Sequence, residues 1–363
     1  MLSFRFKTAS WIRLSIGLIA TSWAGAESPR VRRLEVAPGI QPQLSVTAEG
    51  HVWLVYANAG DIHVASSPDG GTTFAPPVKV ATVPKLMAGM RRGPRIAAVG
   101  NHVTVTAVAQ ELIAFHSSDA GKTWSEPVTI NDAPTSAREG LHDLALAPDG
   151  ALFVTWLDLR NGTMELWGST SHDAGRTWEK NETVYRSPDK SICTCCQPSA
   201  LFDAAGNLAV MWRNSLEGSR DLWLSTRAAD RREFSPAKKL GEGTWKLDGC
   251  PMDGGRIIAS NAGEFSAVWQ RAGEVFFCPA VGPEIKLGAG KQPVAVPTGA
   301  QPLVVWQQGA DLVSATVGVS SEPTIIAAEA RYPVLLPLPN GHGAVLAYEQ
   351  GPTATPHVVV ERW

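Results

Sequence analysis

The sequence predicts an all-β protein, a β-propeller whose four-stranded blades form a ring. Three observations lead to this fold class. The composition is rich in turn residues and tryptophan, an octet of turn residues is repeated, and pairs of short apolar segments return about every 48 residues, the length of one propeller blade.

The composition already excludes several classes of protein. The 363 residues include 34 Gly, 26 Pro and 13 Trp, which excludes a coiled coil or a long-helix protein. A hydrophobic content of 44% and a charged content of 18% exclude a disordered chain. The net charge of −2 offers no basic surface for DNA or RNA, so we expect no nucleic-acid partner.

The first 26 residues have the pattern of a secretory signal peptide. Three basic residues precede an apolar run at residues 14–20, and small residues at 24–26 form a cleavage site. The apolar run is too short to span a bilayer, and no other apolar segment of the chain is long enough to do so. We therefore expect a secreted or periplasmic protein, with no membrane span once residues 1–26 are removed.

An octet with the pattern Ser-x-Asp-x-Gly-x-Thr-Trp/Phe occurs at residues 67–74, 117–124 and 171–178. Its Asp side chain accepts hydrogen bonds from nearby backbone N–H groups, and its Gly supplies a positive φ, so the octet predicts a tight hairpin turn. A fourth copy ending in Phe234 has lost the Asp and the Gly. The residues that we expect to stabilise these turns are Asp69, Gly71, Asp119, Gly121, Asp173 and Gly175.

The octet resembles the Asp box, or BNR repeat, of the sialidase superfamily. The resemblance implies a β-propeller in which the Asp boxes are structural and lie on the face opposite the active site. Sialidases have six blades, so the resemblance favours six where the repeat count favours seven.

The count of seven comes from pairs of short β segments, each joined by a tight turn. The second segment of a pair ends in an aromatic residue in every repeat except the second, which has Ala107. We interpret these aromatic residues as packing positions between blades. The predicted pairs are 43–48 with 51–56, 95–99 with 102–107, 144–148 with 151–156, 199–203 with 207–212, 256–260 with 264–269, 294–297 with 301–306, and 333–337 with 343–348.

The last repeat ends at Trp363 after only three strands. Residues 31–36 can supply the missing fourth strand, which would close the ring and remove exposed sheet edges. We therefore expect a single domain at residues 27–363.

The candidate site residues lie just before the first strand of a blade or just after the second. Both positions map to the face opposite the Asp boxes. Sialidase chemistry uses a Tyr nucleophile with a carboxylate base, an acid, and arginines that bind the substrate carboxylate. By this resemblance the catalytic candidates are Tyr332, Glu139, Asp143 and His142, with Glu217 as another possible base and Asp158 as another possible acid. The substrate-binding candidates are Arg92, Arg95, Asp158, Arg160, Arg213, Arg271 and Arg331.

Four of the five cysteines lie in the loops that precede two consecutive blades, and these loops allow three interpretations. In an exported protein a disulfide from Cys250 to Cys195 or Cys196 would join the fourth and fifth blades. Alternatively, a soft metal ion, Cu(I) or Zn, could be bound by thiolates near His142 and Met252. A nucleophilic cysteine with His142 as its base is the third interpretation. The candidate metal ligands are Cys193, Cys195, Cys196 and Cys250.

Together these observations predict an exported, sialidase-like propeller with a polar site, which would act as a glycan-directed hydrolase of non-standard type. The alternatives are a non-catalytic propeller that binds a ligand or a protein, and a metal-binding propeller that uses the cysteine cluster. We expect a monomer whose ligand is a glycan or another small polar molecule. No cofactor is expected apart from the soft metal.

Overall fold

The computed structural model describes residues 1–2, 32–259, 263–299, 301–320, 322–341 and 343–363. The predicted signal peptide falls almost entirely in residues 3–31 and so lies outside the described residues. In the described part of the chain, no helix is long and apolar enough to cross a membrane.

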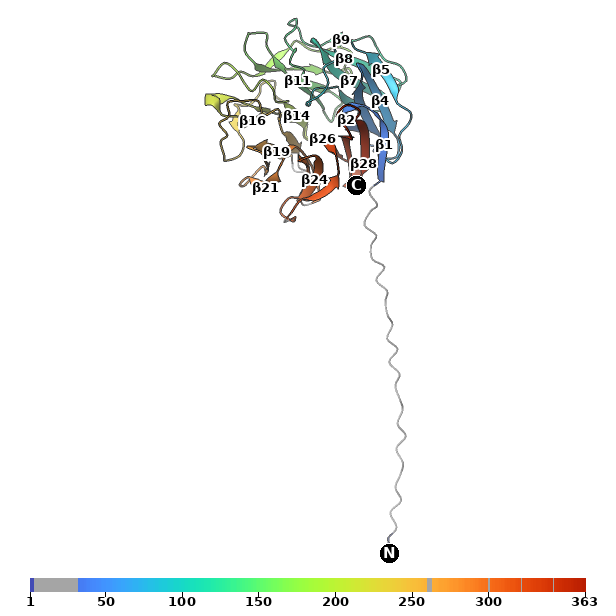
Figure 1. Ribbon diagram of the computed structural model, residues 1–363. Helices are drawn as coiled ribbons and strands as arrows, with labels where there is room; N and C mark the ends of the chain where they lie inside the picture. The colour runs from blue at the N-terminus through green and yellow to red at the C-terminus, as the bar shows by residue number, and fades with distance from the viewer. Residues whose placement is uncertain (3–31, 260–262, 300, 321, 342) are drawn as a thin grey trace. The chain divides into compact units, whose positions relative to one another are not determined.

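The described strands form seven antiparallel four-stranded sheets, and the sheets follow one another around a ring in chain order (Figure 1). The fold is a seven-bladed β-propeller, so the repeat count is correct and the six blades implied by the sialidase resemblance are not found. Blades one to three are β2 (Ile40–Val46), β3 (Val52–Asn58), β4 (Asp61–Ser67) and β5 (Val78–Thr82); β6 (Arg95–Val99), β7 (His102–Ala109), β8 (Glu111–Ser117) and β9 (Val128–Thr129); and β10 (His142–Leu146), β11 (Leu152–Asp158), β12 (Glu165–Ser171) and β13 (Glu182–Tyr185).

The other four blades continue the same order. They are β14 (Ser199–Phe202), β15 (Leu208–Arg213), β16 (Leu222–Arg227) and β17 (Lys238–Lys239); β18 (Arg256–Ala259), β19 (Phe265–Arg271), β20 (Glu274–Cys278) and β21 (Ile285–Ala289); β22 (Lys291–Thr298), β23 (Gln301–Gln308), β24 (Asp311–Thr316) and β25 (Thr324–Ala327); and β26 (Ala330–Pro337), β27 (Ala344–Gln350), β28 (His357–Arg362) and β1 (Arg32–Pro38). Two short 3-10 helices, Leu216–Gly218 and Pro339–Gly341, interrupt the loops.

The ring is closed by the N-terminal strand, as the sequence predicts. Strand β1 pairs antiparallel with β28, so the two ends of the propeller meet in one blade. In Figure 1 the blue β1 lies beside the red β28. This pairing gives hydrogen-bond partners to the backbone groups along the edge of β28, which the last three-stranded repeat would otherwise leave exposed.

The Asp boxes form the turns between the third and fourth strands of the first three blades. In the second box, Asp119 Oδ1 accepts hydrogen bonds from the N–H groups of Lys122 (3.1 Å) and Thr123 (2.9 Å), and its Oδ2 accepts one from the Thr123 hydroxyl at 2.6 Å. Asp69 and Asp173 accept equivalent bonds. These bonds lower the pKa of Asp119 to about 2. The boxes therefore stabilise turns, as expected.

The aromatic residue near the end of each second strand packs against the preceding blade. Trp212 lies in a core cluster with residues of blade three, and Trp306 lies in one with residues of blade five. All six of these aromatic side chains, and Ala107 in the exceptional blade, are at most 2% exposed. The tryptophan-rich composition thus reflects the contacts between blades.

Candidate functional site

The first strands of the seven blades line a central cavity with a volume of about 350 Å³. Its wall is mostly aliphatic, with residues such as Leu44 and Leu144. At the end where these strands begin, the lining becomes charged, with Arg95, Asp143 and Arg256. This end lies on the face opposite the Asp boxes, where the candidate residues were predicted to gather.

Asp143 accepts bonds from three directions. Arg256 Nη1 lies 2.8 Å from its Oδ2, the N–H of Ala200 donates to the same oxygen at 3.0 Å, and Arg95 Nε lies 3.6 Å from its Oδ1. Burial lowers the pKa of Arg95 to about 10 even though Asp143 opposes the shift. These contacts make Asp143 a link among four blades, two to five, which does not suit a catalytic acid.

A second buried arginine crosses the channel. Arg91 precedes the second blade, yet its guanidinium donates to the side chain of Gln292 and, at 2.9 Å, to the carbonyl of Pro333, in blades six and seven. The carboxylate of Asp253 accepts a bond from the N–H of Gln292 at 2.6 Å. Buried polar groups from blades two, five, six and seven thus contact one another at this end of the channel.

Three first strands begin at the mouth with a β-bulge. Gln41, Gln292 and Tyr332 occupy equivalent positions, with φ of 53°, 57° and 53°, and each precedes a proline. Positive φ is rare for residues other than glycine, and such strained positions are often found at functional sites. The bulges place one polar residue from each of three blades at the start of its first strand, and the side chains of Gln41 and Gln292 are buried.

Tyr332 lies in a charged environment. The Arg91 guanidinium is 5.7 Å from the centre of its ring. Burial, together with the nearby charge of Glu349, raises the pKa of Tyr332. Glu349 accepts bonds from the N–H and Nε2 of Gln41, at 2.8 and 2.9 Å, and from Arg331 Nε at 2.9 Å. Burial nevertheless raises the pKa of Glu349 above its ordinary value.

Arg92 and Glu139 approach each other in the loops that precede the second and third blades. Arg92 Nε donates to the backbone carbonyl of Glu139 at 2.6 Å. Both side chains are half-buried, and no hydrogen bond or ion pair engages the Glu139 carboxylate within the described residues. Glu139 therefore keeps a carboxylate that can meet a ligand.

The other candidates are dispersed and structurally engaged. Asp158 is fully buried and accepts bonds from Ser136, Trp156 and Arg160, which hold its pKa below the ordinary value although burial opposes this. Arg160 also stacks on Trp167 at 3.7 Å. These residues form a packed network at the third blade, away from Tyr332.

Arg213 and Arg271 also make internal contacts. Arg213 donates to the backbone carbonyls of Asp253 (2.9 Å) and Gln270 (2.8 Å) and to that of Arg220. Arg271 forms a bidentate ion pair with Glu284. Neither guanidinium is available as a substrate clamp.

His142 does not approach the cysteines. Its Nε2 lies 3.0 Å from the hydroxyl of Thr106, and complete burial holds the pKa of the ring well below its ordinary value, helped by Arg95. In the described residues, the ligand atoms that gather at the cysteine loops belong to cysteines alone.

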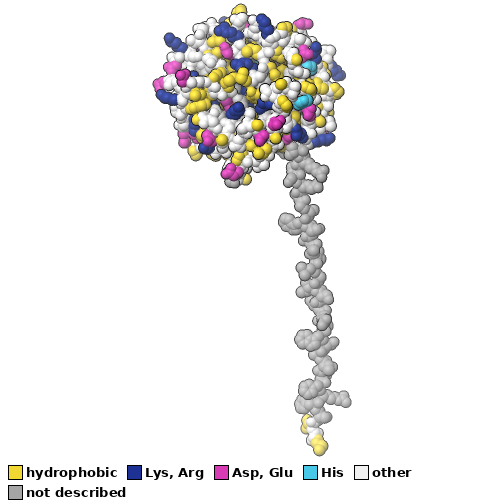
Figure 2. Space-filling view, viewed as in Figure 1, with side chains coloured by type: hydrophobic (Ala, Val, Ile, Leu, Met, Phe, Trp, Pro, Cys, Tyr) yellow, Lys and Arg dark blue, Asp and Glu magenta, His cyan; other side chains and the backbone are white. Residues whose placement is uncertain are grey.

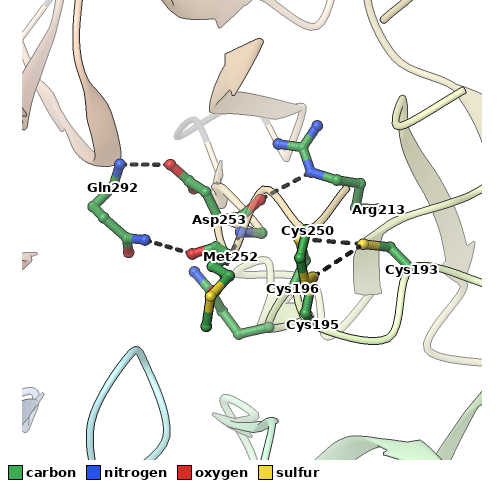
Figure 3. The surroundings of a disulfide bond; sticks show 10 residues. Cys193, Cys195, Cys196, Arg213, Cys250, Met252, Asp253 and Gln292 are labelled. Atoms are coloured by element: carbon green, nitrogen blue, oxygen red, sulfur yellow. Dashed lines mark hydrogen bonds between the residues drawn. A yellow bond between two sulfur atoms is a disulfide. The ribbon is translucent and has the colours of Figure 1, made fainter. Parts of the chain in front are cut away.

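The cysteine loops contain the predicted disulfide. Cys195 and Cys250 are bonded and join blades four and five, whereas Cys193 and Cys196 are free and buried. The Cys193 and Cys196 sulfur atoms lie 3.4 Å apart, and their interaction lowers the pKa of Cys193 to about 6. Figure 3 shows the sulfur atoms turned toward one another, with Met252 and Arg213 nearby.

Sequence reasoning did not select three residues of the mouth, Gln41, Gln292 and Arg256, and it gave no role to three others that it placed on this face, Arg91, Asp253 and Glu349. One signal could have found the first two. A residue followed by proline opens the first strand in Ile40-Gln41-Pro42, Lys291-Gln292-Pro293 and Arg331-Tyr332-Pro333. This recurrence marks the three equivalent bulges.

The fold and its turns define an Asp-box propeller with a polar channel mouth. Residues 96–341 match the model of the BNR repeat-like domain, and the chain belongs to this family of sialidase-related propellers. Among curated proteins, none matches the sequence.

Several solved structures share the fold. A protein of unknown function from Dyadobacter fermentans has a TM-score of 0.54 at 13% identity, over 92% of this chain and 99% of that one. An α-L-arabinanase from Penicillium chrysogenum, complexed with arabinobiose, has a TM-score of 0.51 at 14% identity, over 91% and 98%. An α-L-arabinofuranosidase from Fusarium graminearum has the same TM-score and identity, over 91% and 97%. At these identities the likeness concerns the fold alone.

Proposed function

We propose that this protein is a glycan-directed hydrolase whose substrate binds at the channel mouth, with Tyr332 as the reacting group. The observation that carries the proposal is the placement of Tyr332. It stands on a strained bulge, with the Arg91 guanidinium over its ring and the Glu349–Arg331 ion pair beside it. Family membership and the arabinose-directed enzymes of the same fold agree with a sugar substrate.

The chemistry follows from the charges around Tyr332. Since its pKa is raised, the phenol is neutral in the free protein and must lose its proton as it attacks the anomeric carbon. Glu349, whose own pKa is raised, is suited to receive that proton. Glu139 carries a carboxylate without a hydrogen bond or ion pair among the described residues and would protonate the leaving group.

An acidic glycan is the substrate class that the mouth favours. The terminal guanidinium nitrogens of Arg92 have no partner within the described residues, so Arg92 can bind a carboxylate of the sugar in a bidentate manner. Figure 2 shows basic and acidic side chains interspersed over the visible face, so this preference rests on the local arginines and not on the overall charge.

The test is hydrolysis of a panel of sialosides, acidic polysaccharides and arabinan by the full chain. Tyr332→Phe should reduce product release at least ~100-fold and leave binding intact, because it removes only the nucleophilic oxygen. Glu139→Gln should reduce it by about 10²–10⁴-fold. Tyr185→Phe is the matched control, since Tyr185 lies in an outer strand and its hydroxyl only accepts a bond from Asn214. Equal activity of Tyr332→Phe and the control would refute the mechanism.

A non-catalytic glycan-binding propeller is the second candidate. It is favoured by the full engagement of Asp143 and Asp158, which leaves few acids for catalysis. Saturable binding of one glycan without any product from the wild-type protein would establish this alternative.

We also propose that the protein is exported to the periplasm or the medium. The disulfide between Cys195 and Cys250 supports this, because disulfides persist in oxidising compartments. N-terminal sequencing of the mature protein should begin at Glu27. An intact Met1 on the mature protein would refute the proposal.

A further inference from the structure

Four cysteines meet where blades four and five adjoin, in a place that the proposed hydrolase does not use; Cys193, Cys195 and Cys196 are buried and Cys250 is exposed. Three of them, on Cys193, Cys195 and Cys196, lie within 4.8 Å of one another, and the fourth, on Cys250, is bonded to Cys195. Cys193 is 3% exposed and Cys196 is 1% exposed. A single disulfide thus coexists with two free thiols at van der Waals distance from it (Figure 3).

The spacing of the sulfur atoms fits one tetrahedral metal ion. Four thiolates about 2.3 Å from a zinc ion stand about 3.8 Å apart. The Cys193 sulfur lies 3.4 Å from that of Cys196 and 3.7 Å from that of Cys195. We propose that, once the Cys195–Cys250 disulfide is reduced, these four cysteines bind one Zn²⁺ as a tetrathiolate site joining blades four and five.

The surroundings compensate the charge of such a site. A zinc ion with four thiolates carries a net charge of −2, and the positive side chains of Arg213 and Arg220 act directly on Cys193. Arg213 is held in place by three backbone carbonyls, so its position is fixed independently of any metal. Two positive charges therefore balance the excess negative charge in a buried place, where an uncompensated charge would be costly.

The neighbouring backbone also favours thiolates. The backbone of Cys195 lowers the pKa of Cys193, and the backbone of Asp253 acts in the same direction on Cys196. Such outer contacts orient metal-bound ligands. Met252 packs against the three sulfurs and covers them with an apolar side chain.

The redox step balances as a thiol–disulfide exchange. A dithiol reductant donates two electrons and two protons to the Cys195–Cys250 disulfide and becomes a disulfide itself, leaving four thiols in the protein. Zinc then displaces the thiol protons as it binds. The oxidised protein retains only two of the four ligands, so metal binding is controlled by the redox state. The site shares no residue with the proposed hydrolase, and either proposal can fail without the other.

The test titrates Zn²⁺ into the full chain, with and without a phosphine reductant under anaerobic conditions. The reduced protein should bind one Zn²⁺ per chain and the oxidised protein none. Co²⁺ in the reduced wild-type protein should give the intense visible bands of a tetrahedral tetrathiolate complex, which tests the site without any substitution. No binding by the reduced protein, equal binding by the oxidised protein, or binding of Cu(I) but not Zn²⁺ would overturn the assignment.

Substitutions then locate the site. Cys193→Ser and Cys196→Ser should each abolish stoichiometric binding and the Co²⁺ bands while leaving the Cys195–Cys250 disulfide intact under oxidising conditions. The control is Cys278→Ser, because Cys278 is a free cysteine outside the cluster and should not affect binding. Binding that survives in both cluster variants, or that is lost in the control, would also overturn the proposal.

Discussion

The contribution of one hydrogen bond to stability can be measured by making the same substitution at Trp212 and at Trp306. Both are fully buried at equivalent positions, in the second strands of blades four and six. The indole N–H of Trp306 donates to the carbonyl of Ala289 at 3.0 Å. The indole N–H of Trp212 is buried without a hydrogen-bond partner among the described residues. Replacing each by phenylalanine removes the same atoms but only one hydrogen bond.

The expected free energies follow from these contacts. Trp→Phe deletes roughly 40 Å³ of side chain, which at about 24 cal/mol per Å³ costs about 1 kcal/mol at either position. At Trp306 the loss of the hydrogen bond adds about 0.5–1.5 kcal/mol, the net value of a hydrogen bond whose acceptor residue, Ala289, is exposed. At Trp212 the substitution removes an unpaired donor, which offsets part of the packing loss. Trp306→Phe should therefore destabilise the protein by about 0.5–1.5 kcal/mol more than Trp212→Phe.

Urea unfolding followed by circular dichroism measures this difference, provided that the two variants unfold with the same m-value. Fluorescence is less suitable because many tryptophans contribute to it. Equal destabilisation by the two substitutions, or a larger effect at Trp212, would refute the reasoning.

The remaining predictions concern the disulfide and an Asp box. Cys250→Ser should lower the free energy of unfolding by about 4 kcal/mol, because the bond closes a loop with a sequence separation of 55; the difference should vanish in reductant, and its persistence there would contradict this. Asp119 has its pKa lowered to about 2 in the folded protein, so its stabilising contribution is complete above pH ~4 and is lost as the pH falls through about 2. The difference in unfolding free energy between wild type and Asp119→Asn should therefore shrink from pH 4 to pH 2, and a constant difference would contradict the assignment.

The architecture was predictable because the propeller repeats itself. Each octet specifies its own turn through contacts that span only four residues, such as Asp119 with Thr123. The alternation of paired segments gave the correct number of blades where the family resemblance suggested six. The disulfide was also foreseeable, since consecutive blades place equivalent loops side by side.

The side-chain contacts at the channel mouth could not be predicted from the sequence repeat. Arg91 contacts Gln292 across 201 positions of sequence, and Gln41 contacts Glu349 across 308. Such contacts depend on the path that each loop takes around the channel, and no local sequence pattern specifies this path. For the same reason, position in the loops could not separate Arg213, which donates to backbone carbonyls, from Arg92, whose terminal nitrogens have no partner in the described part of the chain.

The strand β1 has a consequence for the order in which the molecule can assemble. Of the described strands, β1 is the first to be synthesised, and its hydrogen-bonding partner β28 is the last. The closing blade therefore cannot form until β28 has been synthesised, and such distant pairing makes folding slow. A nascent chain that stalls before β28 leaves β1 as an unpaired edge.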